Sequence, residues 1–305
     1  MRKAFIDTLV KLAEKDDRIY LVTADMGRGL VEPFSDKYPE RFINVGVAEQ
    51  TMIGVATGLA LSGKIPFVYS ISNFPTLRCV EHIRNACYHN LNINIVAGGT
   101  GLTYGALGSS HHATEDISVM RSLPNMVVEV PSDSAETTIA TKSIAKLDNP
   151  CYLRIGRADR DVTHLSKLKI GKAISLAEGE TATIISMGWM MSLVIQAEEI
   201  LNRQGIKSRV LNMHTVKPID TEAILKAASE TKAIVTVEEH SVIGGLGSAV
   251  AEVLADISCN VKFKRMGIPD KFCTNVGTHD ELLEECHLTI DDIISEVVKL
   301  ISKES

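Results

Sequence analysis

The sequence has few aromatic residues, no long apolar run and no Cys-x-x-Cys pair. Aromatic residues make up 5% of its 305 residues, and one of them is tryptophan. No apolar stretch is long enough to span a bilayer, which excludes a membrane helix and leads us to expect a cytoplasmic protein. Its six cysteines are scattered along a chain of this size, which argues against a disulfide framework and for reduced, mostly structural thiols.

The sequence also lacks a basic run or stripe. Its 32 Lys and Arg residues and 38 Asp and Glu residues give a formal net charge of -6. This balance gives no support for a nucleic-acid partner. With 45% hydrophobic and 23% charged residues the composition is that of an ordinary globular protein. Small molecules and other proteins remain as binding partners.

Short apolar, β-branched runs alternate with helical patterns in the first half of the chain. An amphipathic helix is expected in residues 1–17. The expected strands are 19–23, 66–69, 93–97, 126–130 and 151–155. The expected helices between them are 50–62, 76–88, 113–122 and 134–146. This alternation predicts a mainly parallel sheet that is covered by helices on both faces.

A second α/β pattern follows a polar, charged stretch, 158–179, which we interpret as a linker. The second set of expected strands is 182–186, 208–212, 233–237 and 261–266. The second set of expected helices is 191–204, 221–231, 248–257 and 290–302. The predicted fold is therefore α/β, with two consecutive open sheets and domains at 1–175 and 176–305.

The segment Val45 to Gln50 places one carboxyl group, that of Glu49, at the start of an uncharged helix. Gly54 and Gly58 in that helix allow a neighbour to approach closely, so Glu49 is expected to lie at an interface. A carboxyl group that is removed from water holds or shares a proton more readily, which is a catalytic property. The alternative is that Glu49 only complements the helix dipole.

A glycine-rich loop, 98–108, leaves a predicted central strand and leads to His111 and His112. Ligands of open α/β sheets bind outside such strand ends, and glycines permit close approach. The loop is neither a Walker loop nor a dinucleotide fingerprint. Either histidine can exchange a proton with a polarised carbonyl, or can serve as a structural hydrogen-bonding group. As a metal site the pair is weak, because no third ligand sits at helical spacing.

Other candidate ligand groups lie near predicted strand ends. Tyr69, Phe74 and Arg78 follow the second strand, where an aromatic ring could stack on a flat ligand or pack in the core. Arg154 and Arg157 lie at the last strand of the first domain. Arginine there suits a phosphate or carboxylate, and the alternative is an ion pair with one of the chain's acids.

Taken together, these segments resemble the C-terminal half of a thiamine-diphosphate-dependent transketolase, or of the related 1-deoxyxylulose-5-phosphate synthase. The resemblance covers nearly the whole chain, and the set of motifs in this order is more specific than any one of them. The matching segments are 24–25, 45–50, 79–85, 108–111, 123–126, 131–133, 217–220 and 238–247.

The resemblance implies a pyrimidine-binding domain followed by a transketolase C-terminal domain. It implies that Glu49 contacts the ring nitrogen of the cofactor's aminopyrimidine and that His111 assists proton transfer or stabilises the intermediate. Asp25 matches an aspartate near the cofactor, Arg78 matches a pyrimidine-side arginine, and Tyr69 or Phe74 replaces the usual stacking aromatic residue. The implied substrate-binding residues are Arg157, Arg154 and His112.

One part of the family's site is missing from this sequence. The Gly-Asp-Gly motif with a downstream Asn, which binds Mg2+ and the diphosphate, does not occur. We therefore expect a separate N-terminal subunit to supply it, giving a split transketolase-like enzyme, an α2β2 heterotetramer, that transfers a two-carbon ketol unit between sugars. The alternatives are the β subunit of a 2-oxo acid dehydrogenase and a non-catalytic partner subunit.

The sequence departs from the family at positions that contact the substrate. Leu107 stands where the family has an aspartate that recognises an acceptor hydroxyl, and Gly99 stands where it has a histidine that contacts phosphate. These departures put the ordinary pentose phosphates in doubt. A modified or nucleotide-linked sugar, or a different acceptor aldehyde, is expected instead.

Overall fold

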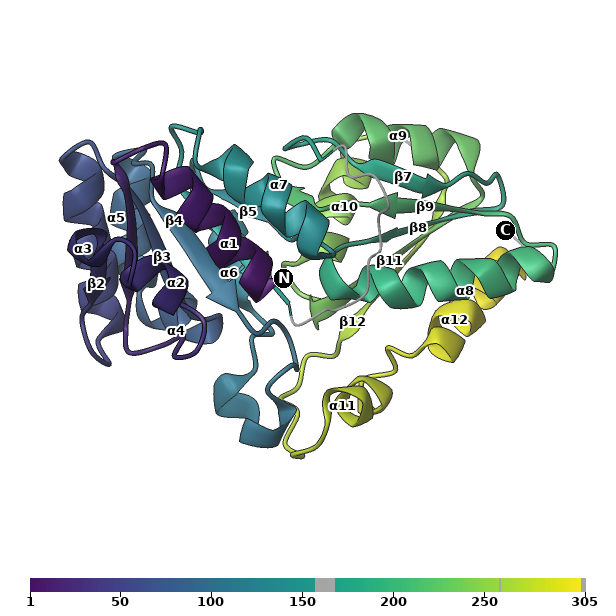
Figure 1. Cartoon of the computed structure of the whole chain (residues 1–305). Helices are drawn as coiled ribbons and strands as arrows, with labels where there is room; N and C mark the ends of the chain where they lie inside the picture. The colour runs from purple at the N-terminus through teal and green to yellow at the C-terminus, as the bar shows by residue number, and fades with distance from the viewer. Residues whose placement is uncertain (157–167, 258, 303–305) are drawn as a thin grey trace.

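The computed structural model describes residues 1–156, 168–257 and 259–302. The first sheet is built mainly from the first half of the chain (Figure 1). Its seven strands run in the order β10-β5-β6-β4-β3-β1-β2, and every pairing is parallel except that of β10 with β5. The strands are β1 Ile19–Thr23, β2 Phe42–Asn44, β3 Ile65–Ile71, β4 Asn94–Gly98, β5 Val127–Glu129, β6 Cys151–Ile155 and β10 Thr215–Lys217.

Helices cover both faces of this sheet, and its central strands are therefore buried on both sides. Every residue of β3, β4 and β6 is buried, as expected for parallel strands between helix layers. One face packs on α1 Arg2–Ala13, α2 Glu32–Ser35 and α7 Ser134–Ile144. The other packs on α3 Glu49–Leu61, α5 Val80–Tyr88 and α6 Asp116–Ser122, and the short helix α4 Asn73–Arg78 precedes α5.

The second sheet has five strands in the order β12-β11-β8-β9-β7, and β7 is antiparallel to β9. Its strands are β7 Ile174–Ala177, β8 Ala182–Ser186, β9 Ser208–Asn212, β11 Ala233–Ser241 and β12 Lys262–Ile268. Its helices are α8 Met191–Arg203, α9 Thr221–Glu230, α10 Leu246–Ala255, α11 His279–Glu285 and α12 Ile290–Ser302. None of the helices in the described ranges is long and apolar enough to cross a membrane.

The structure confirms the predicted fold class and corrects several local predictions. The predicted linker, 158–179, contains β7, an edge strand whose half-exposed residues give a weak apolar pattern. The predicted helix 76–88 is two helices that meet at Cys79, whose backbone is not helical. The first begins earlier, at Asn73, because Pro75 lies in its first turn, where a missing N–H costs nothing. The domain boundary near residue 175 stays a prediction.

Two buried polar networks join the halves of the chain, and the first surrounds Glu129 at the end of β5. Its carboxylate accepts a hydrogen bond from the Thr215 hydroxyl at 2.6 Å and lies 3.2 Å from Nδ1 of His214. All three side chains are essentially inaccessible to water. Because β10 begins at Thr215, this network secures the strand that the second half of the chain adds to the first sheet.

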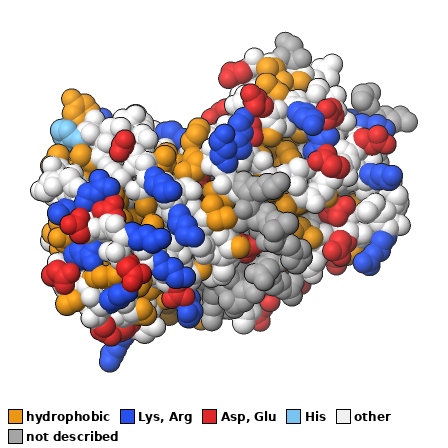
Figure 2. All heavy atoms as spheres, turned by 45° about the horizontal axis from the view of Figure 1, so that its top comes forward, with side chains coloured by type: hydrophobic (Ala, Val, Ile, Leu, Met, Phe, Trp, Pro, Cys, Tyr) orange, Lys and Arg blue, Asp and Glu red, His pale blue; other side chains and the backbone are white. Residues whose placement is uncertain are grey.

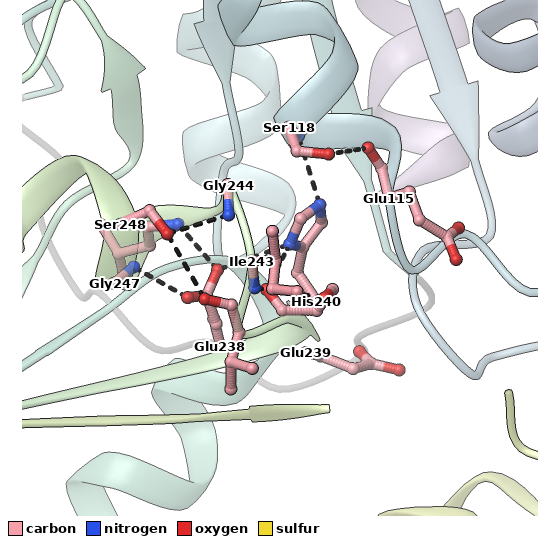
Figure 3. A network of polar contacts seen from close by, with 12 residues as sticks. Glu115, Ser118, Glu238, Glu239, His240, Ile243, Gly244, Gly247 and Ser248 are labelled. Atoms are coloured by element: carbon pink, nitrogen blue, oxygen red, sulfur yellow. Dashed lines mark hydrogen bonds and ion pairs between the residues drawn. The ribbon is translucent and has the colours of Figure 1, made fainter. Parts of the chain in front are cut away.

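The second network surrounds β11, and Figure 3 shows the carboxylates of Glu238 and Glu239 pointing to opposite sides of that strand. Glu238 accepts hydrogen bonds from the N–H groups of Leu246 and Gly247 at the start of α10, both at 2.7 Å. His240 donates from Nδ1 to its neighbour's carbonyl and accepts the N–H of Ser118 through Nε2. A neutral imidazole therefore ties α6 of the first domain to β11 of the second.

We predict that Glu129→Ala lowers the free energy of unfolding by about 1–3 kcal/mol, because it removes the buried carboxylate that binds His214 and Thr215. Denaturant unfolding of the two proteins measures this difference. The matched control is Glu199→Ala, which removes an exposed acid 3.8 Å from Arg203 and should cost less than about 0.5 kcal/mol. Equal costs for the two variants would contradict a structural role for the Glu129 network.

The network around β11 predicts a specific pH dependence of stability. Burial raises the pKa of Glu238 to about 7, so the folded chain holds a proton there that the unfolded chain has released, and stability falls as pH rises towards 7. Burial lowers the pKa of His240 to about 4. As pH falls below about 6.5, the unfolded chain takes up a proton there before the folded chain does, so stability falls with falling pH.

Glu238→Gln removes the effect of Glu238 on the pH dependence of stability and leaves that of His240. The stability of the wild type relative to this variant should therefore fall by about 3 kcal/mol from about pH 4.5 to about pH 7.5. Denaturant unfolding across this range measures the difference, and parallel stability profiles would show that Glu238 does not titrate as expected.

Candidate functional site

Four predicted site residues from three separate segments form one continuous chain of contacts. The Glu49 side chain, with 6% of its surface exposed, accepts a hydrogen bond from Nη1 of Arg78 at 3.0 Å. The Arg78 guanidinium lies 4.2 Å from the centre of the Phe74 ring. The His111 ring meets the Phe74 ring edge-on at a centroid distance of 5.3 Å. Carboxylate, guanidinium, aromatic ring and imidazole thus lie in a row.

The backbone around Glu49 explains how its carboxylate reaches this row. Gly46 adopts a φ of 74°, which favours glycine, and the chain turns there from β2 into α3. Glu49 is the first residue of α3 and is buried, whereas Val47, two residues before it, is 77% exposed. Gln50 donates from Nε2 to the Arg78 carbonyl at 3.1 Å, so α3 also holds the end of α4.

His111 lies in a short 3-10 turn, Ser109–His111, five residues before α6 begins at Asp116. It is therefore not at a helix N-terminus, because α6 starts three residues later than predicted. Asn73 donates from Nδ2 to the Ser110 carbonyl at 2.5 Å, and the Ser110 hydroxyl lies 3.0 Å from Nδ1 of His111. The α4 segment thus positions the turn that carries the histidine.

The loop before His111 is shaped by glycines that face bulky groups. Gly99 has a φ of 77°, and a side chain there would collide with the Tyr104 ring. Tyr104 therefore occupies the space that a residue larger than glycine would need at position 99. In Figure 1 the blue loop, with its two short helical turns, lies below the sheets beside the segment that leads into α11.

His112 and Arg154 are buried and lie outside the row. His112 is 5% exposed, and burial lowers its pKa from the ordinary value. Its Nε2 atom has no hydrogen-bond partner among the described residues. Arg154 is 3% exposed, and its guanidinium binds Asp116 at 2.7 Å and the carbonyls of Ala113 and Glu239. The structure does not support a substrate contact for Arg154, because its donors bind protein groups.

The structure does not bring the other predicted residues into the row. Tyr69 is 3% exposed and stacks on Phe5, on the sheet face that α1 covers, because alternate residues of β3 face opposite layers. Asp25 follows β1, is exposed and has a φ of 54°. Arg157 lies outside the described residues.

Asn73, Ser110 and Glu239 support this site and were not predicted to do so. Asn73 and Ser110 make contacts that join α4 to the loop, and no sequence motif marks that pairing. Glu239 accepts the N–H of Leu102 across 137 positions of sequence. In the sequence, Glu239 was marked only by its place in the matching segment 238–247.

Two family models match the chain in the order of its two sheets. Residues 1–160 match the transketolase pyrimidine binding domain, and residues 171–293 match the transketolase C-terminal domain. On the face shown in Figure 2, acidic and basic side chains both occur over each domain.

Similar proteins align over almost the entire chain. A protein of Methanocaldococcus jannaschii named as a transketolase C-terminal section is 42% identical, over 100% of this chain and 97% of that protein. The 6-deoxy-6-sulfo-D-fructose transketolase subunit SqwH of Clostridium sp. (strain MSTE9) is 43% identical, over 96% of this chain and 92% of the subunit. A solved split-gene transketolase, described as an inactive β4 tetramer, is 39% identical with a TM-score of 0.89, over 99% of this chain and 97% of that one.

These matches agree with the order of the domains and with the fold of both sheets. The chain therefore belongs to the transketolase family of thiamine-diphosphate-dependent transferases and consists of the family's pyrimidine-binding and C-terminal domains.

Proposed function

We propose that this chain is the β-type subunit of a split transketolase that transfers a two-carbon ketol unit between sugars. An N-terminal subunit supplies the site for Mg2+ and the cofactor's diphosphate, and the two chains form an α2β2 heterotetramer. The observation that carries this proposal is the row formed by Glu49, Arg78, Phe74 and His111. Relatives that are themselves transketolase subunits favour it over an oxo acid dehydrogenase subunit.

The groups in the row fit the aminopyrimidine half of thiamine diphosphate. Arg78 binds Oε2 of Glu49, and Oε1 has no hydrogen-bond partner among the described residues. This oxygen is free to bind a ring nitrogen, and the Phe74 ring lies beyond the Arg78 guanidinium, where it adds an aromatic surface to the row. When bound, thiamine diphosphate supplies the nucleophilic carbon that attacks a ketose carbonyl.

In this proposal the protein's side chains move protons and exclude water. Glu49 holds or shares a proton at its carboxylate, and the surrounding burial keeps water away. Arg78 holds that carboxylate in place. His111 donates or accepts a proton at the substrate's oxygen, and its contacts with Ser110 and Phe74 orient the ring. Asp25, at the end of β1, lies on the cofactor side of the sheet in this assignment.

The exposed face of α3 supports a protein partner next to Glu49. Val47 and Leu61, before and at the end of this helix, are 77% and 64% exposed. Within the described part of the chain, nothing beyond the adjoining residues and the helix's own backbone lies within 4 Å of a Cβ built on Gly54 or Gly58. An uncharged helix face with open glycines lets the backbone of another protein approach closely. A protein bound there would lie next to Glu49.

The residues near the loop tip argue for a substrate other than an ordinary pentose phosphate. Leu107, at the aspartate position of the family, is 54% exposed. Tyr104 fills the space above Gly99, so no phosphate-binding side chain fits there. Arg157 and His112 remain our proposed substrate contacts. We propose a modified sugar or a different acceptor aldehyde as the substrate.

The proposal predicts that Glu49→Gln in the assembled complex lowers turnover at least about 100-fold without dissociating it, because the amide cannot exchange the proton. Ketol transfer by the purified complex measures turnover, and size-exclusion chromatography measures assembly. Glu81→Gln, at an exposed acid on α5, is the control and should have no effect. Unchanged turnover in Glu49→Gln would instead support a non-catalytic partner subunit.

The partner surface predicts that Gly54→Arg blocks assembly while the isolated chain still folds, because open space surrounds this helical position. Arginine also has a higher helix propensity than glycine, so α3 is not weakened. Circular dichroism measures the fold, and titration with the N-terminal subunit measures association. Ser229→Arg on α9 is the control for an added surface charge. Normal association of Gly54→Arg would exclude this face from the interface.

A further inference from the structure

Glu239, in the second domain, binds the loop that carries His111. This inference rests on the proposed function, in which His111 acts on the substrate. The Glu239 side chain is 3% exposed, and its Oε1 atom accepts a hydrogen bond from the Leu102 N–H at 2.7 Å. The same oxygen lies 2.6 Å from Nε2 of His279, at the start of α11. One carboxylate oxygen therefore joins the loop of the first domain to β11 and α11 of the second.

The shape of the loop follows this contact. Gly101 has a φ of 51°, and a Cβ there would collide with the Glu239 carboxyl group. At Gly105 a Cβ would meet the Gly277 carbonyl oxygen at 2.5 Å, and at Gly108 it would meet Val276 at 3.7 Å. Gly101 and Gly105 thus let the backbone lie directly against the second domain, whereas Gly108 leaves room for an ordinary side-chain contact.

The two ends of the loop are also closed on each other near Glu239. Gly101 and Ala113 form an isolated antiparallel bridge, and the Ala113 carbonyl accepts a hydrogen bond from Arg154. Arg154 donates from the same nitrogen to the Glu239 carbonyl at 3.1 Å. Both the backbone and the side chain of Glu239 therefore hold the base of the segment from which His111 projects.

We propose that Glu239 is a positioning residue, through which the C-terminal domain fixes the loop that presents His111 to the substrate. Glu239 does not reach the row of site residues, so its effect must pass through the loop. His279 keeps the carboxylate in place, and the ring of Trp189 packs against the imidazole at a centroid distance of 4.7 Å. The contact gives the second domain a direct part in the geometry of the active site.

Hydrogen exchange of the isolated chain tests the physical contact without a partner or substrate. In Glu239→Ala the Leu102 amide loses its acceptor, so peptides covering 99–113 should exchange at least about tenfold faster than in the wild type. Glu239→Gln keeps an oxygen acceptor and should restore most of the protection. Peptides over β8 should be unchanged in both variants. Wild-type exchange of 99–113 in Glu239→Ala would overturn the proposal.

A double-mutant cycle in the assembled enzyme tests whether the effect passes through His111. Glu239→Ala alone should lower kcat at least about tenfold with little change in KM, because a misplaced proton-transfer group affects the chemical step. In a His111→Ala background the same change should have almost no further effect on kcat. Equal losses in both backgrounds would overturn the proposal, because Glu239 would then act independently of His111.

The matched control removes another contact between the domains that does not touch the loop. Glu252 of α10 pairs with Arg121 of α6 at 2.5 Å and is exposed. Glu252→Ala should leave both the exchange of 99–113 and kcat unchanged, and a loss equal to that of Glu239→Ala would overturn the proposal. A wild-type assembly without transferase activity would contradict the proposed function, and the exchange result alone would then decide whether Glu239 fixes the loop.

Discussion

The structure depends on a buried guanidinium, that of Arg154, where the two domains meet. A buried charge needs partners, and removing one of them is costly. Nε and Nη2 of Arg154 bind groups from three other segments: the Asp116 carboxylate of α6, the Ala113 carbonyl of the loop and the Glu239 carbonyl of β11. One side chain on β6 thereby sets the distance between the first sheet, the His111 loop and the second sheet.

The candidate site combines a rigid side with an open one. Glu49 is held from within by Arg78, and the Phe74 ring lies on the other side of that guanidinium. On the outside, α3 presents exposed apolar side chains and open glycines. If the proposed assembly forms, a partner on this surface would cover the side of Glu49 that Arg78 does not contact, and in the proposed function activity then depends on assembly.

Most of the fold was predictable because its central strands are buried on both faces. The bounds predicted for β1, β6, β8 and β9 agree with the structure, since parallel strands between helix layers are continuous apolar runs. Two edge strands were missed. β7 is half exposed, and β10 has only three residues. Their place in a sheet depends on pairing partners that local sequence does not reveal.

The site was predictable only as far as motifs mark it. Glu49, Phe74, Arg78 and His111 were named from motifs, and the structure places them in contact. Tyr69 and Arg154 were also named, but the alternation of side chains along a strand and the pairing of a buried charge direct them elsewhere. The role of Glu239 was not predictable, because its partner Leu102 is 137 positions away.

The strand β10 has a consequence for how this protein can evolve. It comes from the second half of the chain, yet it forms the edge of the first sheet beside β5. If either domain were replaced by that of a related protein, β10 and β5 would still have to pair in the same register and keep the buried contacts of Glu129. This shared edge therefore disfavours recombination at the junction between the domains.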